Sequence, residues 1–287
     1  MNLQNFEFKK EIVKSWNNTL SNKAVIIYPK SIDQLTKLIK LLDKNKKKYL
    51  LRTGSCSYDS KSINPDIETF IISLKYINKI LKIDLKNKTI DIESGALIAD
   101  IVKKIKNKNL ALYSVPGGNK ISIGGAISAN VIGKDSSASV ASFGDALLGL
   151  HVLKKDGKIK KLMRGNKNFY KFIGAFGLEG IIIRAKLKVK KTITQNLRVK
   201  SKILKSIKNI KDDFDINSDY HYIQIDPFFR KENFAVSFRG YYCNLKDNLY
   251  KKINLNAYKV EEIIFKVLGK FINLYTWKIF YKLFFLF

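Results

Sequence analysis

The stretch that decides the fold is Val115-Pro-Gly-Gly-Asn-Lys-Ile-Ser-Ile-Gly-Gly-Ala-Ile-Ser-Ala-Asn-Val-Ile-Gly-Lys134, which runs on to a Ser-Phe-Gly turn at residues 142–144. Five glycines fall within the seventeen residues from Gly117 to Gly133, in a chain otherwise crowded with Lys and Ile. Glycine is used in ordered structure where the backbone takes a positive φ or lies against a bulky group. Since small residues and Ile separate these glycines, we expect a surface on which a large flat ligand lies against the main chain.

The composition is that of a folded, strongly basic protein. The chain has 287 residues, 46% of them hydrophobic, so it can hold one large domain or two and bury a substantial core. Its 54 Lys and Arg residues against 24 acidic residues give a formal charge of +30. That charge would attract nucleic acid, anionic lipid or phosphorylated ligands. The lysines are spread along the whole chain, however, which favours a general compositional bias, and we expect no nucleic-acid partner.

Residue types that carry metal and redox chemistry are scarce. The two cysteines, Cys56 and Cys243, form no CxxC motif, and the two histidines, His151 and His221, have no ligand-like spacing. We therefore expect no metal. The polar N-terminus lacks the apolar segment of a signal peptide, and no uncharged apolar run approaches the roughly 18 residues of a membrane span. We expect a cytoplasmic protein, with the inner face of the membrane as a further location.

The segment before the glycine-rich stretch has the pattern strand, helix, strand and tight loop. Residues 24–28 predict a buried strand, and Ser31 with Gln34 forms a capping-box signature. Apolar residues then recur at helical spacing, namely Leu35, Leu38, Ile39 and Leu42. Residues 49–52 predict the next strand. The polar turn at 53–59 follows it, in an arrangement that cradles phosphates in many nucleotide sites.

Alternating and helical patterns continue to about residue 191. The expected elements are hairpins at 81–93 and 147–162, helices at 97–105 and 169–176, and a long strand at 181–189. The second hairpin is indicated most clearly, because Asp156-Gly157 is a strong turn signal. Mixed hairpins and crossovers of this kind predict an α+β fold.

The remainder of the chain has a different pattern. It is polar and partly helical at 205–218, and strands are predicted at 220–226 and 234–240. We therefore predict two domains, at residues 15–191 and 192–287.

The order of these motifs resembles the FAD-binding domain of the vanillyl-alcohol oxidase/PCMH flavoprotein superfamily. Within it, the pattern is most similar to the decaprenylphosphoryl-ribose oxidase branch, and aldonolactone oxidases are more distant. The motifs that carry the resemblance are Ser57-Tyr58, Pro116-Gly117, Gly124-Gly125-Ala126, Gly133-Lys134, Ser142-Phe143-Gly144, Asp156-Gly157 and Gly177-Leu178-Glu179-Gly180. The resemblance implies a PCMH-type FAD-binding domain of two α/β subdomains, followed by an incomplete α+β substrate domain.

The resemblance also implies which residues surround FAD. Backbone N–H groups of the turn at 53–58 would form an anion nest for the pyrophosphate. Gly124-Gly125 would bring a short helix start against it, and residues 129–133 would line the isoalloxazine ring. The predicted cofactor-binding residues are Thr53, Gly54, Ser55, Cys56, Ser57, Tyr58, Pro116, Gly117, Gly118, Ser122, Gly124, Gly125, Ala129, Ile132, Gly133 and Ile182.

Three positions bear on the chemistry. Many superfamily members attach FAD covalently to a His in the first turn, where this chain has Cys56, so we expect noncovalent FAD. Lys134 is implied to face the substrate side of the flavin, where it would stabilise negative charge, and it is our one candidate catalytic residue. Ile132 takes the place of a His found in the most similar branch.

The segment at 263–287 has two interpretations. It is rich in aromatic residues, and its lysines permit a basic amphipathic helix on an anionic membrane. Alternatively it is substrate-domain core whose covering strands are missing, either by truncation or because a second polypeptide supplies them.

The chemistry implied by the resemblance is removal of hydride from a hydroxyl-bearing carbon of a sugar or polyprenyl-phosphate sugar. Expected partners are that substrate, a second polypeptide or reductase, and a peripheral membrane surface. The alternatives are a flavin-binding subunit without turnover by itself, an aldonolactone-type oxidase, and, more remotely, a basic binder of nucleic acid or membrane surfaces.

Overall fold

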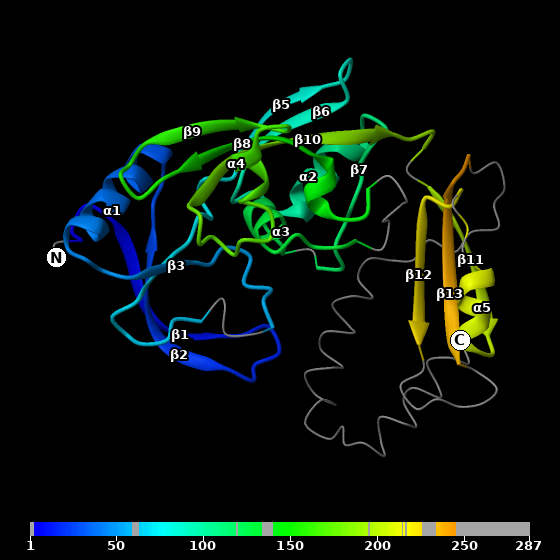
Figure 1. The fold of residues 1–287 in the computed structure, drawn as a ribbon, viewed down its shortest axis with the longest axis horizontal. Helices are drawn as coiled ribbons and strands as arrows, with labels where there is room; N and C mark the ends of the chain where they lie inside the picture. The colour runs from blue at the N-terminus through cyan, green and yellow to red at the C-terminus, as the bar shows by residue number, and fades with distance from the viewer. Residues whose placement is uncertain are drawn as a thin grey trace. The chain divides into compact units, whose positions relative to one another are not determined.

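The chain forms a mixed α+β structure (Figure 1). A computed structural model describes residues 3–58, 63–118, 120–133, 140–194, 196–213, 215, 217–225 and 234–244. Two layers of sheet and helix make up the first two thirds of the chain, and a small sheet follows them. The predicted α+β class is confirmed.

The first layer is a four-stranded sheet with one helix. Its elements are β1 (Glu7–Lys14), β2 (Ser21–Tyr28), α1 (Ile32–Lys44), β3 (Tyr49–Leu51) and β4 (Phe70–Ile72). The strand order is β1-β2-β4-β3, with β1 antiparallel to β2 and the other pairs parallel. The predicted apolar face of α1 is fully buried. The Ser31 hydroxyl accepts from the Gln34 N–H, but the Gln34 side chain reaches the Lys30 N–H and not, as predicted, that of Ser31.

The second layer is a larger antiparallel sheet. Its strands are β5 (Ile80–Asp84), β6 (Thr89–Glu93), β7 (Leu110–Leu112), β8 (Leu147–Leu153), β9 (Ile159–Met163) and β10 (Ile181–Lys191). The order is β5-β6-β10-β8-β9, and β7 also pairs with β10. The helical elements are α2 (Ile98–Lys106), α3 (Ile123–Ser128), the 3₁₀ turn η2 (Phe143–Ala146) and α4 (Lys167–Tyr170). Helices α2, α3 and α4 lie on the same side of this sheet (Figure 1) and pack into one apolar core with it.

Strand β10 belongs to both layers. Successive side chains of a strand point to opposite faces, and the register shift between Ile182 and Arg184 changes which residues of β10 face each core. Ile181 and Ile183 are buried in the cluster that surrounds α1, whereas Ile182 and Leu187 are buried in the cluster beneath α2 and α3. One strand thus contributes buried residues to both cores.

The last described part of the chain holds a three-stranded sheet and a short helix. The elements are β11 (Leu197–Leu204), α5 (Ile207–Asp212), β12 (Tyr220–Ile225) and β13 (Ala235–Tyr242), with strand order β11-β13-β12. The two strands and the helical segment predicted here are confirmed. The chain divides into two compact units, of which the larger contains both α/β layers and comprises Met1–Lys200, Asp215–Tyr222 and Phe238–Cys243. The domain limits 15–191 and 192–287 remain predictions, and the segment 263–287 lies outside the described residues.

The helix predicted at 169–176 is wrong beyond its first turn. α4 ends at Tyr170, and the chain then takes positive φ at Gly174, Phe176 and Gly177. A right-handed helix cannot continue through such residues.

Among the described residues, no helix combines the length and the apolar character needed to cross a membrane.

Candidate functional site

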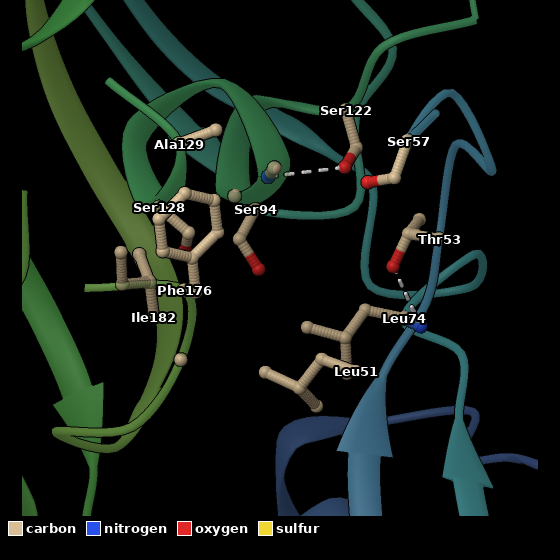
Figure 2. Close-up of a pocket in the computed structure, with 13 residues that line it drawn as sticks. Leu51, Thr53, Ser57, Leu74, Ser94, Ser122, Ser128, Ala129, Phe176 and Ile182 are labelled. Carbon is tan, nitrogen blue, oxygen red and sulfur yellow. Dashed lines mark hydrogen bonds between the residues drawn. The ribbon is translucent and has the colours of Figure 1, made fainter. Parts of the chain in front are cut away.

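A pocket opens where the loop after β3, helix α3 and the loop before β10 meet (Figure 2). It encloses about 650 Å³, its open mouth included. The lining residues are Leu51, Thr53, Ser57, Leu74, Ser94, Ser122, Gly124, Gly125, Ser128, Ala129, Phe176, Gly177 and Ile182.

The loop at 53–58 offers hydrogen-bond donors to this pocket. Its first residue is anchored, because the Thr53 hydroxyl accepts from the Leu74 N–H at 3.2 Å. Within the described part of the chain, none of the backbone N–H groups from Thr53 to Tyr58 donates to the protein. Ser55 takes a φ of 58°, the left-handed conformation that occurs in anion-binding nests. The loop can therefore give several amide donors to an anionic ligand.

Helix α3 contributes a bare glycine surface and no free donors. The Ile123 N–H donates to the Ala96 carbonyl at 2.9 Å, the Gly124 N–H to the Ser94 carbonyl at 2.7 Å, and the Gly125 N–H to the Ser122 hydroxyl at 3.2 Å. The expected helix start is therefore present, but its first amides are already engaged. A β-carbon on Gly124 would lie 3.1 Å from that of Ser94, so glycine permits the helix to sit this close.

The Ser94 hydroxyl is the most informative polar group of the site. Ser94 is 1% exposed, and its hydroxyl has no hydrogen-bond partner among the described residues. Figure 2 shows this hydroxyl pointing into the space between Ile182 on one side and Leu51 on the other. An unpaired buried hydroxyl destabilises a fold unless something satisfies it. A polar atom of a bound ligand would do so here.

Phe176 forms an apolar wall under backbone strain. Its φ is 51°, and its N–H donates to the Ser128 carbonyl at 2.9 Å. A positive φ is a genuine outlier for an aromatic residue, and strained residues of this kind cluster at functional sites. The ring is drawn beside Ile182 at the edge of the pocket (Figure 2).

The structure brings about half of the predicted cofactor residues into the pocket. Those that line it are Thr53, Ser57, Ser122, Gly124, Gly125, Ala129 and Ile182. The other described ones, which do not line it, are Gly54, Ser55, Cys56, Tyr58, Pro116, Gly117, Gly118, Ile132 and Gly133. The predicted catalytic residue Lys134 lies outside the described residues. The cofactor contacts of all these residues remain predictions.

Several of the residues outside the pocket have a clear place. Gly54 packs its backbone against that of Lys120, and the Gly133 N–H donates to the Ser114 hydroxyl at 2.9 Å. Ile132 is 72% exposed. Cys56 is half-buried, its thiol donates to the Gly54 carbonyl at 3.3 Å, and burial raises the pKa of that thiol.

Sequence reasoning missed six lining residues, which are Leu51, Leu74, Ser94, Ser128, Phe176 and Gly177. The two leucines have the pattern of ordinary strand core. Gly177 lies three residues before Gly180. This spacing predicts a turn that ends the preceding helix, and that turn could have pointed to Gly177 as a lining residue. The described residues hold no group of three or more His, Cys, Asp or Glu side chains that could bind a metal ion.

The family profile for the FAD binding domain matches residues 23–163, which include both predicted ligand loops and most of the pocket. The chain belongs to the PCMH-type FAD-binding superfamily. The match covers the two layers from β2 to β9, while β1, α4 and β10 lie outside it. FAD is accordingly the cofactor of this domain.

Individual relatives support the same assignment. The chain is 28% identical over 127 residues to decaprenylphosphoryl-beta-D-ribose oxidase of Mycolicibacterium smegmatis, covering 43% of this chain and 27% of that protein. It is 26% identical over 172 residues to glycolate oxidase subunit GlcD of Bacillus subtilis, covering 57% and 36%. The match thus spans about a third of each curated relative's length.

A solved structure shows the fold of the PCMH-type domain independently. A cholesterol oxidase variant from Brevibacterium sterolicum superimposes with a TM-score of 0.73 at 12% identity, covering 87% of this chain and 50% of that one. At this identity the similarity concerns the fold alone.

The pocket fits FAD on three observations. The loop at 53–58 supplies unengaged amides suited to a pyrophosphate. Gly124 and Gly125 let a large ligand approach the main chain. The Ser94 hydroxyl is buried and unpaired at the pocket wall. The residues that would hold FAD therefore come from both layers of the domain.

Proposed function

We propose that the protein is an FAD-dependent oxidoreductase that removes hydride from a hydroxyl-bearing carbon of a sugar or lipid-linked sugar. The observation that carries this proposal is the unpaired Ser94 hydroxyl in a pocket bounded by unengaged amides and bare glycine. The flavin, when bound, supplies the hydride acceptor. The names of the two relatives, oxidases of a decaprenylphosphoryl ribose and of glycolate, support a hydroxyl-bearing substrate.

The chain's own residues bind and orient the cofactor. The amides of the loop at 53–58 neutralise the pyrophosphate, and the Ser94 hydroxyl donates to a polar atom of the ligand. Ile182 and Phe176 exclude water from the pocket, which strengthens polar contacts inside it. Because burial keeps the Cys56 thiol protonated, that residue is a weak nucleophile, and we propose that FAD is held noncovalently.

A second candidate is a flavin-binding subunit that does not turn over by itself. The name of one relative, a subunit of glycolate oxidase, supports it. In this case a second polypeptide supplies the substrate-binding residues. A reductase partner and contact with the inner face of the membrane belong to the same proposal, as does Lys134 as the residue that stabilises negative charge near the flavin.

Flavin binding is tested first, and turnover is tested after it. The purified chain is expected to be yellow, or to become so on addition of FAD, with quenching of flavin fluorescence. Anaerobic mixing with a panel of sugars and polyprenyl-phosphate sugars is expected to bleach the visible flavin band. Bleaching by dithionite but by no sugar would support the subunit. Failure to bind FAD would refute both candidates.

A further inference from the structure

The antiparallel sheet of the second layer has a groove on its other face. α2, α3 and α4 pack into one core on one side of this sheet. The groove encloses about 820 Å³, its open mouth included, and is lined by residues of β5, β6, β8, β9 and β10. Four lysine and arginine side chains line it, against the single carboxylate of Asp91; these residues are Lys82, Lys161, Arg184 and Lys186. The groove therefore carries a strong positive potential.

The strand register brings three basic side chains into one row. Arg184 on β10 lies directly opposite His151 on β8, and His151 lies directly opposite Lys161 on β9. Directly opposed side chains in an antiparallel sheet are close neighbours. Arg184 and Lys161 therefore lie on either side of His151.

The protein itself leaves the row largely uncompensated. The Arg184 Nε atom is buried and has no hydrogen-bond partner among the described residues. Glu93 lies opposite Arg184, but its carboxylate accepts from the Lys79 N–H at 2.8 Å, and the described chain shows no ion pair between Glu93 and Arg184. The ammonium of Lys82, an exposed side chain, lies 3.5 Å from the Asp84 carboxylate.

The groove also has a shape suited to a small ligand. Gly149 lies on its floor, beside Met163, where a β-carbon would lie 3.1 Å from the Met163 sulfur. Leu81 and Met163 provide apolar surface at its rim. The groove thus combines a cationic row with a short apolar edge.

We propose that this groove binds a phosphate-bearing ligand, with the phosphate between Arg184 and Lys161 and its carbon portion against Leu81 and Met163. The chemistry is that of a fixed guanidinium fork and a flexible ammonium around a dianion. The site is distinct from the FAD pocket, because none of its lining residues is shared with that pocket.

His151 reports on occupancy of the groove. The pKa of the His151 imidazole is lowered, mainly by burial and further by the positive charges of Arg184 and Lys161. The Asp91 carboxylate acts in the opposite direction and raises it. The charged and titratable groups near it are Arg184 and Lys186 on β10, Lys161 on β9, Asp91 and Glu93 on β6, Lys82 on β5, and Lys30, Asp33, Tyr76 and Lys79 from the adjoining surface. A bound dianion would offset the cations and return the pKa of His151 upward.

The test is a proton NMR titration of the FAD-loaded full chain, which has only two histidines. His221→Asn assigns the remaining imidazole signal to His151. Addition of inorganic phosphate or glycerol 3-phosphate is expected to raise the pKa of His151 by about half a unit or more. Potassium chloride at matched ionic strength serves as the reference. Vesicles of phosphatidic acid, compared with vesicles of phosphatidylcholine, tell whether a lipid headgroup is also accepted.

Matched variants separate the groove from general surface charge. Lys161→Gln is expected to weaken phosphate binding about tenfold, the loss of one charge-assisted contact, without changing FAD affinity. Lys160→Gln removes the same charge from the next residue of β9, which pairs with buried Val152 and is not part of the groove, and is expected to bind phosphate normally. The proposal is overturned if phosphate acts no differently from chloride, or if the two variants behave alike.

Discussion

The backbone of Gly54 lies directly against the carbonyl oxygen of Lys120, so that any side chain at position 54 would overlap that oxygen. This contact joins the loop after β3 to the strand-like segment that leads into α3. Since the two segments carry the amide donors and the glycine surface of the FAD pocket, their packing fixes the geometry of the site.

Gly54→Ala should therefore damage both the fold and the site. Crowding against a main-chain oxygen cannot be relieved by a side-chain rotation, and we expect a loss of about 1–3 kcal/mol of stability together with weaker FAD binding. Denaturant unfolding of the apoprotein and fluorescence titration with FAD measure the two effects. Unchanged stability would show that the two loops are not packed as described.

Gly125→Ala should weaken FAD binding without destabilising the protein. The new β-carbon would meet only the Ser122 hydroxyl, at 3.2 Å, and alanine is favoured over glycine within a helix by about 1 kcal/mol. Stability should change little, while the added methyl group crowds the pocket and lowers FAD affinity about tenfold. An unaltered affinity would mean that the cofactor does not lie against α3.

Ser94→Ala should weaken FAD binding without destabilising the apoprotein. The hydroxyl makes no described contact with the protein, so removing it leaves no partner unsatisfied. We expect FAD affinity to fall about fivefold, the value of one hydrogen bond of about 1 kcal/mol. Isothermal titration and thermal unfolding of the apoprotein measure the two quantities.

Thr89→Val provides the matched control for that variant. Thr89 on β6 also has a buried hydroxyl without a described partner, but it does not line the pocket. Its replacement should leave FAD affinity unchanged. Equal losses of affinity in both variants would argue against a ligand contact at Ser94.

Two substitutions of Phe176 should measure the backbone strain at the pocket wall. Phe176→Ala removes the ring and keeps the unfavourable positive φ, whereas Phe176→Gly removes both. We expect the glycine variant to be more stable than the alanine variant by about 1 kcal/mol, and both to bind FAD more weakly than the parent protein. Chemical denaturation of the pair measures the difference, and a less stable glycine variant would contradict the strained conformation.

The Asp145 carboxylate should make the free energy of unfolding depend on pH in the acidic range. Its carboxylate accepts from the Ser142 and Ala141 N–H groups at 2.8 and 3.1 Å, and these bonds lower its pKa below the ordinary 3.8. A carboxyl with a lowered folded pKa stabilises the protein above its unfolded pKa, and this contribution is lost as pH falls through the folded pKa. Asp145→Asn should therefore cost about 0.5 kcal/mol at neutral pH, a small value because Asp145 is exposed.

The difference between the parent and Asp145→Asn should shrink as the pH falls below the ordinary carboxyl pKa of 3.8 and through the lowered pKa of Asp145. Urea unfolding at several pH values measures it. Asp100→Asn, another exposed carboxylate near a helix start, serves as the comparison. A constant difference across the whole pH range would rule out titration of Asp145 as the cause.

Much of the fold was predictable because local pattern and tertiary burial agree. The four apolar residues on one face of α1 are all fully buried, and the Asp156-Gly157 turn does join β8 to β9. β1 carried no such signal: only Val13 of its eight residues is buried, so it has no apolar alternation. The three-residue strand β4 is too short to give a pattern, and its pairing depends on β2 and β3, which are distant in sequence.

The site was predictable to a similar degree. Gly124 and Gly125 stand out because glycine pairs are rare in a Lys- and Ile-rich chain, and they do line the pocket. Ser94 carries no signal, since its role depends on its carbonyl accepting from Gly124 and on a hydroxyl left unpaired. Phe176 was placed in a helix because its left-handed backbone cannot be read from the residue type.

The shared position of β10 has a consequence for how the molecule comes apart. Neighbouring residues of this one strand are buried in two separate apolar cores. Loss of β10 would therefore expose the core of each layer to water. Melting should therefore be cooperative, with both layers lost in a single transition. The FAD pocket, whose lining residues come from both layers, would be abolished in that same step and would have no partly folded state in which to persist.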